Sequence, residues 1–376
     1  MNGAGLNGRE VRVGVLFGGR SGEHEVSLMS ARTVMQALQQ AGYETVPIGI
    51  NRNGGWLVSG DPMQRLTDTV NAPELIDGNP PNSHTTNGAA PQLPAPLLNG
   101  EDRLPALDLI FPVLHGPFGE DGTVQGLLEM AGLPYVGSGV LASAAGMDKV
   151  TSKQLFAQAS IPQANYHSFL RRQWRQHPDA IIAELEATLA YPMFVKPANL
   201  GSSVGISKAK DHKQLRRAID TACAFDRKIL VEQGVPAAEI EVSVLGNDDP
   251  IASVPGEVVP SNEFYDYEAK YLDDRSQLLV PAVLNADQVK EIQDLALRAF
   301  RVIDCAGLAR VDFLLSGDGE VFLNEINTMP GFTHASMYPR LWEASGLPLP
   351  ELVQRLVELA LERHDDRLQN RAVRTL

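Results

Sequence analysis

VFLNEINTMPGFTHASM, residues 321–337, begins as a buried strand and then becomes polar without a turn. Side chains two positions apart on a strand share a face, so Glu325 and Asn327 point the same way, with Ile326 on the other face. Burying an unpaired carboxylate costs free energy. The strand therefore needs a partner for its polar face.

The preceding segment, residues 308–316, is a second apolar strand, and Gly-Asp-Gly at 317–319 predicts a hairpin between the two. Arg310 and Asp312 share one face of this first strand. Asp312, Glu325 and Asn327 together form an oxygen cluster of the kind that Mg²⁺ prefers. A solvent-exposed polar face is the alternative, but apolar residues on both faces of each strand favour the metal site.

Composition places the chain among globular proteins. It has 376 residues, is 44% hydrophobic and carries a net charge of −14, which allows two or three domains and excludes nucleic-acid binding through a basic surface. A local cationic pocket stays possible. Cys223 and Cys305 suggest neither a disulfide framework nor a zinc site. No segment approaches the roughly 20 apolar residues that span a bilayer, so we expect no membrane contact and a cytoplasmic location.

The order of elements predicts an α/β fold. Residues 11–17 and 43–50 read as strands, and the helix between them has an apolar stripe, which favours a parallel sheet. Residues 71–105 contain seven prolines and no periodicity, which is typical of a surface insertion or flexible loop. Residues 239–246 and 251–259 read as paired strands. We place domain boundaries so that the segments are 1–138, 139–235 and 236–376.

LGSSVGISK, residues 200–208, is a candidate phosphate loop. Its glycines permit a tight turn whose backbone N–H groups face an anion, although it lacks the Gly-Lys-Ser/Thr of a Walker A loop. Lys196 and Lys149 are candidate phosphate partners. By itself such a loop is more often a plain turn, and a single lysine is more often a solvated surface side chain.

Together the motifs match a known family, although no single motif is specific enough to do so. The chain resembles the ATP-grasp superfamily and, within it, the D-alanine–D-alanine ligases. The resemblance implies a Rossmann-like N-terminal domain with a parallel sheet, followed by a two-part, α+β ATP-grasp fold. The matching stretches, in the expected order, are FGGRSGEHEVSLMSA (17–31), HGPFGEDGTVQGLLEMAGLPYVGSGVLASAAGMDK (115–149), FVKPANLGSSVG (194–205), FYDYEAKY (264–271), ARVDFLL (309–315) and NEINTMPGFTHASM (324–337).

The resemblance implies a reaction that supplies peptidoglycan precursors: ATP and two D-alanines give D-Ala–D-Ala, ADP and phosphate. One D-alanine carboxylate attacks the γ-phosphate, and the amine of the second attacks the resulting acyl phosphate. By family pattern Glu25 would hold the first ammonium and His115 would orient that substrate. From the residues alone, Glu25 equally fits a carboxylate favouring the helix dipole, and His115 a structural histidine.

Further residues follow from the same resemblance. Ser202 and Tyr271 would hydrogen-bond to Glu25 and close two loops over the site as a lid, keeping water from the acyl phosphate. Lys270 would contact the transferred phosphoryl group. Arg310, with the Gly331 backbone N–H, would stabilise the tetrahedral oxyanion. Ser336 and the Met337 backbone would bind the second carboxylate.

The nucleotide would lie among residues of the second and third segments. Lys149 and Lys196 would contact phosphates. Glu232 with the 233–235 backbone would meet adenine, and Glu239 the ribose. Two Mg²⁺ ions, or Mn²⁺ in their place, would be held by Asp312, Glu325 and Asn327. The residues expected to bind ATP are Lys149, Lys196, Ser203, Glu232, Gln233, Val235, Glu239 and Phe264.

Alternatives remain open. One is another ATP-grasp carboxylate–amine ligase, and a second is a D-Ala–D-lactate ligase. Tyr271 favours D-alanine as second substrate, because depsipeptide ligases differ at this lid position, some having Phe. A third is a nucleotide-binding regulator without catalysis, which would need a broken Arg310 or metal set. A dinucleotide-binding protein is weakest, because GGRSG is not G-x-G-x-x-G. The resemblance also implies a homodimer.

Overall fold

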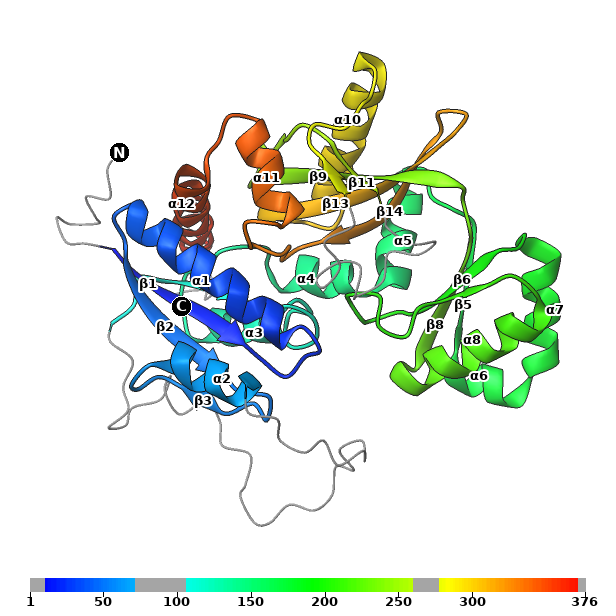
Figure 1. The fold of residues 1–376 in the computed structure, drawn as a ribbon, viewed down its shortest axis with the longest axis horizontal. Helices are drawn as coiled ribbons and strands as arrows, with labels where there is room; N and C mark the ends of the chain where they lie inside the picture. Colours follow the sequence, from blue (N-terminus) through cyan, green and yellow to red (C-terminus); the bar gives the residue numbers. More distant parts are fainter. Residues whose placement is uncertain (1–10, 72–105, 260–276, 371–376) are drawn as a thin grey trace, which may run out of the picture.

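The computed structural model describes residues 11–71, 106–259 and 277–370. Three sheets, each with its own helices, make up this part of the chain (Figure 1). The predicted hairpin, parallel sheet and paired strands are all present. The predicted residues Phe264, Lys270 and Tyr271, and almost all of the proline-rich stretch 71–105, lie outside the described residues; Asn71 ends a helix.

The first sheet has the order β3-β2-β1-β4 and is parallel except for β3. The helix α1 connects β1 to β2, as the apolar pattern predicts. Gly18 ends β1 at φ +93°, and a Cβ there would meet the Ile50 carbonyl oxygen at 2.2 Å, so only glycine fits. The elements are β1 (Arg12–Gly18), α1 (His24–Gln40), β2 (Glu44–Ile50), β3 (Trp56–Leu57), α2 (Pro62–Asn71), β4 (Leu109–Val113) and α3 (Thr123–Met130).

This sheet brings two loops together. The loops after β1 and β4 both leave the carboxyl ends of neighbouring parallel strands, where ligands bind in open α/β sheets. Ser27 ties them: its hydroxyl accepts a bond from Gly18 N at 2.7 Å and donates to the Val113 carbonyl. Residues 19–23 and 114–122 therefore face the same space.

The second sheet is antiparallel, in the order β5-β8-β6-β7, with α7 and α8 against it. Asp211 caps α8 by accepting a bond from Gln214 N at 2.8 Å. The elements are β5 (Tyr166–Leu170), α6 (Arg171–Gln176), α7 (Pro178–Thr188), β6 (Met193–Pro197), β7 (Ser207–Ala209), α8 (His212–Phe225) and β8 (Lys228–Gln233).

The third sheet has the order β12-β11-β9-β13-β14, with β10 paired to β9. The helices α4, α5 and α10 bury their apolar sides against it. Its elements and covering helices are α4 (Val140–Met147), α5 (Lys149–Gln158), β9 (Ala237–Gly246), β10 (Ile251–Ala252), β11 (Gly256–Val259), β12 (Gln277–Leu279), α10 (Ala286–Val302), β13 (Gly307–Ser316) and β14 (Val321–Asn327).

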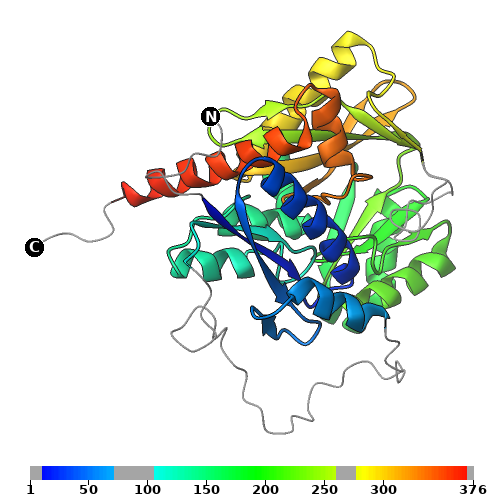
Figure 2. The same ribbon diagram turned by 60° about the vertical axis from the view of Figure 1, so that its left-hand side comes forward.

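The last two helices join the third sheet back to the first. The amphipathic pattern near residues 350–363 predicts a final helix, but not the element against which it packs. The apolar side of α12 (Leu349–Leu368) joins the core of the first sheet and α1, and Figure 2 shows α12 in red beside α1 in blue. The preceding helix, α11 (Met337–Ala344), contributes Tyr338 and Trp342 to the same core. The polar stretch 324–337 is thus held between the first and third sheets.

No helix in the part of the chain that the structure describes is long and apolar enough to cross a membrane. Cys223 and Cys305 are both buried free thiols.

Candidate active site

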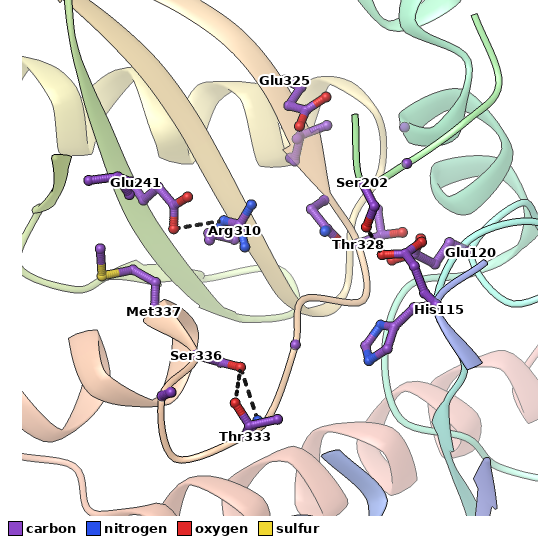
Figure 3. A pocket seen from close by; sticks show the side chains of 18 of the residues that line it. His115, Glu120, Ser202, Glu241, Arg310, Glu325, Thr328, Thr333, Ser336 and Met337 are labelled. Atoms are coloured by element: carbon purple, nitrogen blue, oxygen red, sulfur yellow. Dashed lines mark hydrogen bonds and ion pairs between the residues drawn. The ribbon is translucent and has the colours of Figure 1, made fainter. Parts of the chain in front are cut away.

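Two neighbouring pockets of about 450 Å³ each contain most of the predicted site residues. The first, which we call the substrate pocket, lies between the loops of the first sheet and the stretch 325–337 (Figure 3). The second, which we call the nucleotide pocket, lies between the second and third sheets. Glu325 and Glu241 line both, so the two pockets meet at these carboxylates.

The carboxylate that meets Ser202 is Glu23, which corrects the prediction. Ser202 Oγ donates to Glu23 Oε1, whereas the Glu25 carboxylate pairs with Arg52. Glu23 is 8% exposed and lines the substrate pocket; the Glu25 side chain is 37% exposed and does not.

The start of α1 explains this difference. The helix begins at His24, so Glu23 is its N-cap residue and Glu25 belongs to the first turn. Residues two apart at a helix start do not face the same side. Gly116 and Gly201 wrap Glu23: a Cβ on either would lie 2.9 or 3.1 Å from Glu23 Oε2. Because Gly116 and Gly201 have no Cβ, the two loops that carry them can lie close to the Glu23 carboxylate.

His115 and Glu120 complete this end of the substrate pocket. The ring of His115 is hydrogen-bonded to the Met329 carbonyl at 3.0 Å and to Ser30 Oγ at 3.4 Å. Burial lowers the pKa of His115, although the Glu23 carboxylate acts in the opposite direction. His115 lines the pocket, and its hydrogen bonds fix the ring.

Glu120 has one satisfied and one orphaned oxygen. Its Oε2 accepts a bond from Gly116 N at 2.7 Å, and among the described residues no hydrogen-bond partner reaches Oε1. Burial raises the pKa of Glu120 well above its usual value, and the Glu23 carboxylate adds to the shift. Folding therefore shifts Glu120 toward its protonated form.

Glu120→Gln should therefore flatten the pH dependence of stability. A carboxyl whose pKa is raised on folding contributes stability that is complete below its unfolded pKa and is lost as pH rises through the folded pKa. Within that window the wild-type free energy of unfolding should fall by about 1.4 kcal/mol per pH unit relative to the variant. Thermal melts from acidic to alkaline pH measure this. Parallel curves for wild type and Glu120→Gln would contradict the assignment, and the exposed Glu351→Gln is the control.

Arg310 projects from β13 into the substrate pocket. Its Nε and Nη2 donate to the two oxygens of Asp312 at 2.8 and 2.7 Å, and Nε lies 3.0 Å from Glu241 Oε2. Asp312 and Glu241 are nearly buried. Two fixed carboxylates orient the guanidinium toward the pocket, where it can meet a developing negative charge.

The opposite wall is the N-terminus of α11. Ser336 is the N-cap residue, and its hydroxyl accepts a bond from Thr333 N at 3.0 Å (Figure 3). A helix N-terminus of this kind attracts a carboxylate through its free N–H groups. A Cβ on Gly331 would lie 2.9 Å from Ser336 Oγ, so glycine lets the two segments approach closely. Gly331, Ser336 and Met337 all line the substrate pocket.

The predicted metal ligands meet where the pockets join. Asp312 lies opposite Glu325 in the register of the hairpin, and Arg310 lies opposite Asn327. Asp312 lines the nucleotide pocket, Asn327 the substrate pocket and Glu325 both. No group of three His, Cys, Asp or Glu side chains that could hold a metal occurs among the described residues. Two carboxylates and one amide oxygen still fit Mg²⁺, provided that phosphate oxygens and water complete its shell.

The predicted nucleotide-binding residues gather in the two pockets. Lys149 lines the substrate pocket, with its Nζ 2.8 Å from the Leu200 carbonyl and 3.3 Å from Glu325 Oε2. Ser203 has a left-handed backbone, φ +59°, in the glycine loop. The nucleotide pocket is lined by the predicted residues Lys196, Ser203, Glu232, Gln233, Val235 and Glu239.

Glu232 holds two lysines. Its Oε1 lies 2.5 Å from Lys153 Nζ, and its Oε2 lies 2.5 Å from Lys196 Nζ. Burial alone would raise the pKa of Glu232, and the two ammonium groups lower it to about 2. Burial acts to lower the pKa of Lys196, but Glu232 and the nearby carboxylates outweigh it and raise the pKa. Lys153 was not among the predicted site residues.

Comparisons with known proteins identify the family of this chain. The parallel sheet followed by two antiparallel sheets that enclose a pocket defines an ATP-grasp enzyme. A model of the D-ala D-ala ligase N-terminus matches residues 12–138, and one of the D-ala D-ala ligase C-terminus matches residues 155–358. The chain belongs to the D-alanine–D-alanine ligase family.

Its relatives are similar over almost their full length. D-alanine–D-alanine ligases of Natranaerobius thermophilus and Geobacillus thermodenitrificans are each 50% identical to it, over 96% and 95% of this chain and 98% and 97% of theirs. The D-alanine–D-alanine ligase structure from Coxiella burnetii is 34% identical with a TM-score of 0.78, covering 96% of both chains. The VanG D-Ala:D-Ser ligase from Enterococcus faecalis has the same identity and TM-score, over 94% of this chain and 100% of that one.

Proposed function

We propose that the protein joins two D-alanine molecules at the expense of ATP, giving D-Ala–D-Ala, ADP and phosphate. The observation that carries this proposal is the substrate pocket itself. It is lined by the Glu23 carboxylate for an ammonium, by Ser336 at the N-terminus of α11 for a carboxylate, and by Arg310 for a developing negative charge. Two small zwitterions fit such a pocket in line.

The first step activates one carboxylate. Glu23 binds the ammonium of the first D-alanine, with His115 fixed nearby, so that its carboxylate points toward the nucleotide pocket. A carboxylate oxygen attacks the γ-phosphorus of ATP, the bond to ADP breaks, and D-alanyl phosphate forms. Lys149 and Lys196 neutralise charge on the phosphates.

The second step forms the peptide bond. The second D-alanine is held by its carboxylate at Ser336 and the Met337 backbone N–H, and its neutral amine attacks the acyl carbon. Arg310 and the Gly331 N–H stabilise the oxyanion of the tetrahedral intermediate. The intermediate collapses with loss of phosphate, which takes the bridging oxygen with it.

Asp312, Glu325 and Asn327 would hold Mg²⁺ at the junction of the pockets. When bound, the metal would supply positive charge for phosphoryl transfer, and that charge would offset the cost of placing two carboxylates on adjacent strands. Mn²⁺, with similar oxygen preference, is an expected substitute.

Glu23→Gln should lower kcat/KM for D-alanine, whereas Glu25→Gln should leave it nearly unchanged. Loss of the charge-assisted contact to the ammonium should lower kcat/KM for D-alanine roughly 10- to 100-fold in Glu23→Gln. The KM for ATP should change little. Glu25→Gln should stay within about threefold of wild type, because its partner is Arg52 at the surface. Steady-state kinetics at saturating ATP measure both, and a larger loss in Glu25→Gln would refute the placement of the ammonium.

A substrate panel tests the proposed function. The purified protein with Mg-ATP is given D-alanine, L-alanine, D-alanine with D-serine, or D-alanine with D-lactate, and products are identified by mass spectrometry. We expect D-Ala–D-Ala as the main product. D-serine is included because of the similarity to a D-Ala:D-Ser ligase. A mixed product in excess over D-Ala–D-Ala would reassign the second substrate, and no stimulation of phosphate release by any of them would refute the ligase.

The resemblance also implies a homodimer in the cytoplasm. Light scattering of the purified chain, with and without ATP, tests the dimer. A mass that stays at 40.7 kDa, that of one chain, at micromolar concentration would refute it.

A further inference from the structure

The buried lysine of α5, Lys153, is not explained by the proposed mechanism. Its side chain is 3% exposed, and it lines neither the substrate pocket nor the nucleotide pocket. Among the described residues, its ammonium has one ion-pair partner, Glu232, and lies 5.4 Å from the centre of the Tyr166 ring. Lys153 can therefore reach a nucleotide only by acting through Glu232.

The geometry gives Glu232 two cations, one on each side. Lys196 and Glu232 lie on adjacent strands, β6 and β8, and both line the nucleotide pocket. Lys153 contacts Glu232 from α5 and does not line that pocket. Two ammonium groups and one carboxylate leave a single uncompensated positive charge in a nearly buried cluster. Without Lys153, the remaining Glu232–Lys196 pair would be neutral, and Lys196 would have no surplus charge to offer a phosphate.

We propose that Lys153 is a positioning residue that compensates Glu232, so that Lys196 can bind a nucleotide phosphate. This inference rests on the proposed function, since it assumes that the pocket between the second and third sheets binds ATP. When phosphate arrives, Lys196 shifts part of its interaction to it, and Glu232 keeps a charged partner in Lys153. Leaving a buried carboxylate unpaired would otherwise oppose that shift.

The test separates phosphate binding from adenosine binding. Wild type, Lys153→Met and the conservative Lys153→Arg are compared for ADP and adenosine affinity, by competition with a fluorescent ATP analogue. Lys153→Met should lower ADP affinity roughly 10- to 100-fold, the range expected for a charge-assisted contact, and leave adenosine affinity within about threefold. Lys153→Arg should retain most of the ADP affinity. Equal losses for ADP and adenosine in Lys153→Met would overturn the proposal.

A second variant keeps the proposal testable if Lys153→Met does not fold. Lys153→Met/Glu232→Gln has the same net charge around Lys196 as wild type and removes the buried charges of Lys153 and Glu232 together, while Lys196 keeps its hydrogen bond to Asn324. Because Glu232 is also expected to meet adenine, both affinities of the double variant should fall alike, and its ratio of ADP to adenosine affinity should return to within about threefold of wild type. A ratio as low as in Lys153→Met, or a wild-type-like ratio in a folded Lys153→Met, would refute charge compensation. If wild type itself binds no ADP, the proposed function fails instead, and the two failures are distinct.

Discussion

Arg310→Lys should lower kcat by roughly 10²- to 10³-fold, the loss expected for a donor to a developing oxyanion. Lysine keeps the positive charge but not the planar fork that bonds both oxygens of Asp312 and lies beside Glu241. The KM for ATP should change much less, because Arg310 acts after ATP has bound. Measurement of dipeptide formation across ATP and D-alanine concentrations separates the two effects.

The matched control for Arg310→Lys is Arg355→Lys. Arg355 lies on the exposed side of α12 and pairs with Glu358. This variant should keep wild-type kcat. If a folded Arg310→Lys enzyme turned over within about threefold of wild type, Arg310 would not stabilise the intermediate.

Glu325→Gln should lower turnover by two or more orders of magnitude and raise the Mg²⁺ concentration needed for half-maximal rate. Of the three predicted metal ligands, Glu325 is the one that lines both pockets, and the substitution replaces its carboxylate with an uncharged amide. An amide is a weaker ligand for a hard cation than a carboxylate. Rates measured over a Mg²⁺ titration report both quantities.

The Mg²⁺ titration also separates metal binding from the ion pair of Glu325 with Lys149. Loss of the ion pair alone would change ATP affinity without moving the Mg²⁺ midpoint. Asp318→Asn, in the exposed turn of the same hairpin, is the control and should behave as wild type. An unchanged Mg²⁺ midpoint in Glu325→Gln would remove Glu325 from the metal set.

The hairpin of β13 and β14 could be predicted because local sequence determines it. A Gly-containing turn joins two apolar strands, and alternation fixes which side chains share a face. The same holds for the parallel pairing of β1 and β2 around α1. In both, the information lies within a few dozen consecutive residues.

Glu23 shows where such reasoning fails. Glu23 and Glu25 flank His24, and a shift of one residue in the helix start changes which carboxylate faces inward. The sequence does not fix that boundary, since Glu23 makes no side-chain cap bond. The contact that distinguishes them comes from Ser202, far along the chain.

Lys153 and α12 depend on tertiary structure in the same way. A lysine in a helix is ordinarily exposed, and Lys153 is buried only because Glu232 arrives from β8. The pattern of α12 predicts an apolar side but gives no preference for the first sheet over the third. Amphipathic periodicity specifies that a side is buried, not against which element.

In the proposed reaction, ATP activates the carboxylate of one D-alanine as an acyl phosphate. The most direct test uses D-alanine labelled with ¹⁸O in its carboxylate, and follows the label by mass spectrometry of the phosphate and the dipeptide. Because phosphate leaves with the bridging oxygen, each released phosphate should carry one ¹⁸O, in equal amount to D-Ala–D-Ala. Dipeptide formation with unlabelled phosphate would contradict the account.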